Sequence, residues 1–454
     1  MEPAPHTSPS RGALVLAFSL FLIFRHASYD PTLHLPAGST TLDIGMTDLG
    51  VLLAVGAACI ELRSGRRLPR GRRVWVLWSG AALCAWIVAA TLYGPQLSGT
   101  YPLTASLISS ATFVEYALLA LAGAVLVRTR ADGLAVVGAF VVLGAAAALW
   151  GSLQFLGLVN EFEGRRPLQR EVSFLGNHDF AAVGGATLGV AFAVLATGMA
   201  GRWRAIAWVA AIAGAVGVIL GAAITTVAAI VLCAGIALAV GWHRRLIDRR
   251  RALAIVVLTC VTLAGSVALR GGDIASFFRF LGVSGSERHE TRVESYSQRT
   301  VLSYIGVRIF ADNPLLGVGW QGSLLEENYD PYLDDARRTF PEVSDEALPS
   351  PEHPWGIQNA YIQAGADLGL VGVVLVLVTV VGGIGIAAVA ALRGPPANAG
   401  LALVTLFALI VAAFEWAALG LIPGIPVTAL LWLALGAAVA LPQRGEPEAT
   451  TPNG

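Results

Sequence analysis

Residues 205–242 read AIAWVAAIAGAVGVILGAAITTVAAIVLCAGIALAVGW, a stretch of 38 residues without a charged side chain. An α-helix of that length would be about 57 Å long at 1.5 Å per residue, whereas the hydrocarbon core of a bilayer is about 30 Å thick. The stretch is too long for one membrane-spanning helix and long enough for two. We therefore predict an integral membrane protein with a helical hairpin here, and we place its turn near residues 221–226.

The rest of the chain repeats this pattern. Of its 454 residues, 56% are hydrophobic and only 13% are charged, against about 25% charged residues in an average soluble domain. Apolar runs lie at 13–27, 48–62, 74–92, 105–127, 133–158, 178–199, 205–221, 223–242, 252–269, 368–391, 398–419 and 425–441. We predict an all-α polytopic integral membrane protein with about 12 transmembrane helices, of which the two short first runs are tilted, extended or partly re-entrant.

The charged residues exclude several classes of function. All 30 basic residues are Arg and they balance 30 acidic residues, so the net charge of zero predicts no nucleic-acid partner. The absence of Lys excludes Schiff-base chemistry and the P-loop lysine of nucleotide hydrolysis. The four Cys lie in apolar runs without CxxC spacing, which indicates neither a disulfide framework nor a zinc site. We expect no metal and no cofactor.

The distribution of Arg predicts the orientation in the membrane. One or more Arg residues follow every even-numbered run, and short basic loops stay on the cytoplasmic side. Both termini are then cytoplasmic, with a first helix that is retained rather than cleaved as a signal peptide. The chain divides into transmembrane helices 1–9 (1–269), a large extracytoplasmic loop containing short helices (270–356), transmembrane helices 10–12 (357–441) and a cytoplasmic tail (442–454).

The large loop contains a candidate ligand-binding face. If Glu287–Asp312 is helical, then Arg288, Arg292, Tyr296 and Arg299 lie on one face, and their guanidinium groups suit a phosphate-rich ligand. The alternative is pairing with nearby carboxylates, which we favour for Arg308 with Asp312. Arg299 has no acidic residue three or four positions away, so we favour a ligand for it.

A polar stripe follows the loop where the tenth run enters the membrane. On a helix, Asn359, Gln363 and Asp367 are stacked at four-residue spacing. Such a stripe faces water or protein, and hydrogen bonding between helices explains the amides equally well.

These segments together resemble a known family. The order and spacing of 299–319 (RTVLSYIGVRIFADNPLLGVG) and 358–372 (QNAYIQAGADLGLVG), with 170–181 (REVSFLGNHDFA) upstream, are similar to the signature of the O-antigen ligase and O-antigen polymerase superfamily. The resemblance covers about residues 160–380. It implies a GT-C-like fold and a metal-independent inverting glycosyltransferase of the bacterial cytoplasmic (inner) membrane that assembles cell-surface polysaccharide.

The implied substrates are a glycan and its lipid carrier. The donor would be a glycan on a polyprenyl pyrophosphate such as undecaprenyl pyrophosphate, and the acceptor a hydroxyl of a glycan, lipid or protein on the outer face of the membrane. Ligase and polymerase differ only in the acceptor, and the sequence leaves that choice open. The alternative is a non-catalytic binder or transporter of lipid-linked glycans, and a general solute transporter is a third, weaker interpretation.

The resemblance also implies roles for particular residues. Arg299 would bind the pyrophosphate, as would Arg170, and the further substrate-binding candidates are Arg292, Asn359, Tyr361 and His178. The chain departs from the family in two places. Gln358 occupies the position of the family's catalytic His, although an amide cannot act as a general base near neutral pH. Thr225 and Thr226 stand where the family often has Ser-Arg.

The general base is therefore open on the sequence alone. The catalytic candidates are His353, Asp179 and the position of Gln358 itself, with His178 and Asp367 as further possibilities. Asp179 could instead cap the helix that it begins, and His353 could be a solvated loop residue. Glu115 and Glu415, both within apolar runs, either face an interior cavity or are neutral and bonded between helices.

Overall fold

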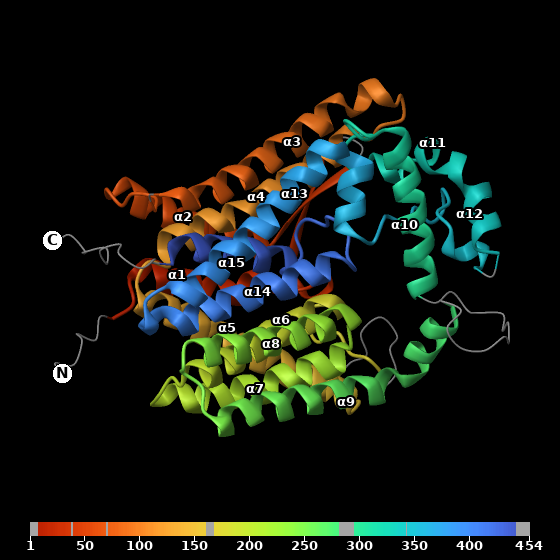
Figure 1. The fold of residues 1–454 in the computed structure, drawn as a ribbon. Coiled ribbons are helices and arrows are strands. Elements are labelled where there is room, and N and C mark those ends of the chain that lie inside the picture. The colour runs from red at the N-terminus through yellow and green to blue at the C-terminus, as the bar shows by residue number, and fades with distance from the viewer. Residues whose placement is uncertain are drawn as a thin grey trace.

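The computed structural model describes residues 8–37, 40–69, 71–159, 168–280, 295–341 and 343–441. Most of these residues are helical, and the long helices lie side by side in one bundle (Figure 1). The α-helices are α1 (Arg11–Ile23), α2 (Met46–Arg63), α3 (Trp75–Leu97), α4 (Leu103–Leu126), α5 (Arg130–Phe155), α6 (Asn177–Thr197), α7 (Arg202–Gly221), α8 (Ile224–His243), α9 (Arg249–Phe280), α10 (Ser295–Asp312), α11 (Glu326–Tyr329), α12 (Leu333–Thr339), α13 (Ala360–Arg393), α14 (Ala399–Trp416) and α15 (Pro426–Ala440).

Each of the twelve predicted apolar runs coincides with one of these helices. Among the described residues, nine helices are long and apolar enough to cross a membrane, while α1 and α15 are apolar but shorter. The prediction of a helical, polytopic membrane protein is confirmed, and the count of twelve spans stays a prediction. α9 continues to Phe280, beyond the predicted end of its run at residue 269.

The turn in the long uncharged stretch lies where the sequence predicts it. α7 ends at Gly221 and α8 begins at Ile224, with Ala222 in the left-handed region at φ 47°. Both helices pack against α6, which is the core of this part of the bundle because 89% of its apolar window is buried. A Cβ atom on Gly184 of α6 would lie 2.8 Å from the backbone of Gly217 in α7, so small residues permit this close backbone approach.

The chain departs from the all-α prediction between α1 and α2. Strands β1 (Thr32–Ala37) and β2 (Thr40–Gly45) form an antiparallel hairpin in which Leu33 pairs with Ile44 and Leu35 with Leu42. Leu and Ile alternate with Thr, His and Asp over only a few positions, a period-2 pattern that favours strands and is hidden between two apolar runs.

α13 is two helices joined at Gly369, where φ is 67° and ψ is −165°. The break exposes backbone groups, and the turn after α10 pairs with them. The backbone N–H groups of Val318 and Gly319 donate to Ala366 and Asp367, while Leu370 donates to Pro314. The Pro-Leu-Leu-Gly-Val-Gly turn and the start of α13 thereby form one unit, which explains why these two segments of the sequence occur together.

The segment with α10, α11 and α12 covers one end of the bundle (Figure 1). It has its own small core, in which Val301, Ile305 and Ile309 of α10 pack against Tyr329 and Leu333. α1 begins at the opposite end, where the backbone N–H of Ser10 donates to Asp132 near the start of α5.

Candidate functional site

Five segments converge at the end of the bundle beneath α10. They are the beginnings of α6, α8, α10 and α13 and the end of α14. Buried or half-buried polar side chains from four of these helices, and Gln358 just before α13, form a continuous hydrogen-bonded chain there. We call this chain the site cluster; its members are Thr225, Thr226, Glu415, His178, Arg299 and Gln358.

Glu415 is the buried anchor of the site cluster. Its side chain has no exposed surface, and its Oε1 accepts hydrogen bonds from the hydroxyls of Thr225, at 2.6 Å, and Thr226. Its Oε2 lies 2.6 Å from Nδ1 of His178. A carboxylate removed from water requires this many partners, because an unpaired buried charge costs several kcal/mol.

Arg299 connects this pair to the segment above the bundle. Its Nη2 lies 2.8 Å from Nε2 of His178, and its Nε donates to Oε1 of Gln358 at 2.7 Å. Burial lowers the pKa of the Arg299 guanidinium from its ordinary value, an effect that nearby Glu415 opposes. The guanidinium stays protonated nevertheless, since arginine does not lose its proton in proteins.

Two more Arg side chains reach the turn between α7 and α8. Arg170 donates from Nε and Nη2 to the carbonyl oxygen of Gly221, at 3.2 and 3.1 Å. Arg270 of α9 donates from Nη1 to the carbonyl of Ala222 at 2.7 Å. These guanidinium groups satisfy carbonyls that the tight turn leaves unpaired, and they place two positive charges beside the site cluster.

The polar stripe at the start of α13 ties that helix to its neighbours. Asn359 caps the helix through Oδ1 and donates from Nδ2 to the carbonyl of Ala417. The hydroxyl of Tyr361 donates to the carbonyl of Ala413 at 2.8 Å. Gln363 donates to Asp367 at 2.9 Å and accepts from the backbone N–H of Leu421. The prediction of a stacked polar stripe is confirmed for Gln363 and Asp367, and the stripe faces protein.

Asp367 joins this stripe to the turn after α10. The residue is fully buried, and its Oδ1 and Oδ2 accept the backbone N–H groups of Ser323, at 2.9 Å, and Gln321, at 3.2 Å. With the donor from Gln363, three hydrogen bonds balance its burial.

Asp179 and His353 lie apart from the site cluster's hydrogen bonds. Asp179, directly after His178, is buried and accepts the backbone N–H of Val427 at the start of α15. His353 is exposed in the loop before α13; its backbone N–H donates to Ser350, and its ring stacks at a tilt on Trp355. Arg292, with the predicted helical start at Glu287, lies outside the described residues.

One predicted contact is wrong. Arg308 pairs with Asp335 of α12 at 2.6 Å and not with Asp312, because Asp312 accepts the hydroxyl of Tyr332 instead. The packing of α10 against α12 brings the carboxylate of Asp335 to Arg308 from 27 positions away in the chain. The spacing of residues within one helix cannot predict such a partner.

Sequence reasoning did not foresee the pairing of Glu415 with His178 or the place of Arg270. The cost of a carboxylate within an apolar run did single out Glu415, but nothing in the sequence names its partner. Arg270 was counted with the large loop, whereas α9 carries it to the α7–α8 turn.

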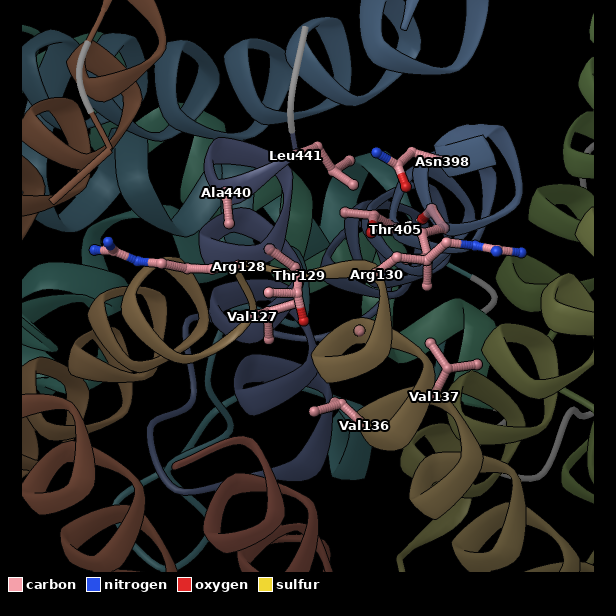
Figure 2. Close-up of a pocket in the computed structure, with 13 residues that line it drawn as sticks. Val127, Arg128, Thr129, Arg130, Val136, Val137, Asn398, Thr405, Ala440 and Leu441 are labelled. Atoms are coloured by element: carbon pink, nitrogen blue, oxygen red, sulfur yellow. Dashed lines mark hydrogen bonds between the residues drawn. The ribbon is translucent and has the colours of Figure 1, made fainter. Parts of the chain in front are cut away.

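A pocket of about 60 Å³ lies elsewhere, beside the start of α5 and the end of α15. Its walls are mainly apolar, and the side chains of Arg128 and Arg130 extend from it in opposite directions (Figure 2). It therefore does not gather converging polar groups as the site cluster does. Within the described ranges, no group of three His, Cys, Asp or Glu residues is placed to hold a metal ion.

The fold and the site cluster define a class of protein: a polytopic helical membrane protein with Arg, His and Glu joined at one end of its bundle. Residues 209–377 match the family model described as O-antigen ligase, and this match supports the resemblance to the O-antigen ligase and polymerase superfamily. None of the curated proteins matches the chain. The matched region contains Arg270, Arg299 and Gln358, whereas His178 and Glu415 lie on either side of it.

Proposed function

We propose that the protein is a membrane glycosyltransferase of the O-antigen ligase or polymerase type. It transfers a glycan from a polyprenyl-pyrophosphate carrier to an acceptor hydroxyl. The observation that carries the proposal is the environment of Arg299. Its hydrogen bonds go to an imidazole and an amide, and no ion pair joins it to a carboxylate in the described part of the chain. Its positive charge is thus held in place and stays available to an anionic ligand.

The transfer reaction requires the positive charge of Arg299 next to the leaving group. When the acceptor oxygen attacks the anomeric carbon with inversion, negative charge develops on the departing pyrophosphate. Arg299 stabilises this charge, and Arg170 and Arg270 add to the positive field from the α7–α8 turn. The three guanidinium groups supply the stabilisation without a metal ion. Among the other candidates, Asn359 and Tyr361 position the start of α13, Arg292 is a further substrate contact, and His353 and Asp179 stay candidates for catalysis.

The site faces the outside of the bacterial inner membrane in this proposal. The clusters of Arg follow α2, α4, α6 and α8 at the end of the bundle opposite α10, and basic short loops favour the cytoplasmic side. Both termini are then cytoplasmic, and the lipid-linked donor reaches the site from the outer leaflet.

Complementation tests the function. Deletion of the gene should cause lipid-linked glycan to accumulate and transferred glycan to disappear, and the wild-type protein should reverse both effects. Arg299→Ala should not. Arg308→Ala is the matched control, because Arg308 lies on the same helix and pairs with Asp335 away from the site cluster. Normal transfer by Arg299→Ala at wild-type abundance would remove the central assignment.

The replacement of the family's His by Gln358 favours a second function, binding or transport of lipid-linked glycans without catalysis. Purified protein with donor and acceptor separates the two. The transferase forms product, whereas the binder retains the carrier lipid and forms none.

A further inference from the structure

We propose that His178 is the general base of the transfer, that Glu415 positions it, and that Arg299 covers it until the donor binds. This inference rests on the proposed function. It places the catalytic base on α6, outside the region that matches the family, and explains how the site works with Gln358 in place of a His.

The contacts determine which ring nitrogen carries the proton. Arginine has only donors, so Nη2 of Arg299 can bond Nε2 of His178 only if that nitrogen carries a lone pair. The ring proton of the neutral imidazole is then on Nδ1, 2.6 Å from Oε2 of Glu415, to which it donates. This is the arrangement that a histidine base needs: one nitrogen bonded to a carboxylate, the other free of hydrogen.

Hydrogen bonds hold the carboxylate of Glu415 in one orientation. Oε1 of Glu415 accepts both Thr225 and Thr226, and the side chain is fully buried. Thr225 and Thr226 therefore have a defined part in the site, where the sequence showed only a departure from the family. When His178 becomes an imidazolium, the adjacent Glu415 compensates the new positive charge.

Arg299 blocks Nε2 of His178 before the donor binds. In the structure its guanidinium occupies the lone pair of Nε2 that would accept a proton. A pyrophosphate offers charged oxygens, which bind a guanidinium more strongly than a neutral imidazole does. Donor binding draws Nη2 of Arg299 to the phosphate and exposes Nε2 to an acceptor on the far side of the anomeric carbon. The base thus becomes available only when a leaving group is present.

In the transfer step one bond to the anomeric carbon forms as another breaks. The acceptor oxygen forms a bond to the anomeric carbon while its proton passes to Nε2 of His178. The bond from the anomeric carbon to the pyrophosphate oxygen breaks, and its electron pair leaves with the pyrophosphate, whose charge Arg299 stabilises. The imidazolium then releases its proton to water, and Nη2 of Arg299 returns to Nε2.

Transfer by the purified full-length protein, with a lipid-linked donor and a soluble acceptor, tests the inference. His178→Ala should lower kcat at least about 100-fold, the usual contribution of a general base, with the donor KM changed less than about threefold. Added imidazole should restore at least about one tenth of the lost turnover, because a small base can enter the space left by the side chain. Glu415→Gln should lower kcat and leave the donor KM unchanged, as a positioning role requires.

His243→Ala is the matched control. His243 is the last residue of α8 and is exposed, at the end opposite Thr225, so its replacement should leave turnover unchanged with or without imidazole. His178→Gln keeps an oxygen that can accept from Arg299 and serves if His178→Ala does not fold. Wild-type turnover by either His178 variant, or a loss in folded His178→Ala that imidazole does not restore, overturns the inference. Absence of product from the wild-type protein would instead overturn the proposed function.

Discussion

His178 and Glu415 are 237 positions apart in the chain, and their side chains meet at 2.6 Å inside the helical bundle. α6 and α14 pack along their length, and this packing brings the two residues to the same end. The pair serves two purposes at once. It ties α6, α8 and α14 together, and it orients the imidazole toward the positive charge of Arg299.

The first prediction concerns stability. Glu415→Ala should destabilise the protein by about 3–5 kcal/mol, the cost of breaking a buried charged pair, because two hydroxyls and an imidazole lose their acceptor. Thermal unfolding in detergent measures the loss. Thr225→Ala removes one of three partners and should cost only about 1 kcal/mol. Equal destabilisation by the two variants would show that the carboxylate does not anchor the cluster.

Gly369 is predicted to be irreplaceable. Its φ of 67° is unfavourable for other residues, and a Cβ atom would lie 2.2 Å from the carbonyl oxygen of Leu315. Gly369→Ala should therefore cost about 2 kcal/mol or more and loosen the turn after α10. Limited proteolysis of the 295–341 segment would detect that loosening. Gly385→Ala, on the same helix with open space around it, should be neutral or stabilising by up to about 1 kcal/mol.

The contact between α10 and α12 should depend on pH. The hydroxyl of Tyr304 and then the guanidinium of Arg308 hold the pKa of Asp335 below its ordinary value. A depressed folded-state pKa stabilises the protein fully above the unfolded value of about 3.9, and the stabilisation is lost as the pH falls through the folded value. Stability measured from neutral pH down to about pH 3 should therefore fall more steeply in the wild-type protein than in Asp335→Asn.

Asp330→Asn is the control for that experiment, since Asp330 is exposed in the same segment and no ion pair involving it occurs among the described residues. It should keep the wild-type pH dependence. If Asp335→Asn also keeps it, the contact with Arg308 and Tyr304 does not contribute to stability.

The helices could be predicted well because the hydrocarbon core of a membrane restricts which backbone structures can cross it. A chain that crosses hydrocarbon must satisfy its backbone within a helix, so apolar runs of sufficient length predict helices directly. The turn at 221–224 followed from length alone. The hairpin of β1 and β2 did not, because its six-residue strands carry only a weak period-2 pattern.

The site could be predicted only one residue at a time. The family resemblance singled out Arg299, His178 and Gln358, and the energetic cost of a carboxylate within an apolar run singled out Glu415. Their contacts depend on how α6, α10 and α14 pack. Sequence spacing predicts neighbours on one helix and says nothing of partners on another. Arg308 illustrates the limit, because its partner Asp335 lies on α12.

A histidine at position 358 should be able to replace His178 as the general base. Gln358 and His178 bond the same guanidinium, at 2.7 and 2.8 Å, so an imidazole at position 358 would also lie next to Arg299. Gln358→His combined with His178→Ala should therefore recover turnover at least about tenfold above His178→Ala alone, by restoring a general base. Gln358→Asn in the same background changes the side chain without adding a base and should recover nothing. A double variant with His at 358 that binds donor as tightly as the wild-type protein and stays as slow as His178→Ala would show that only α6 can present a base to the acceptor.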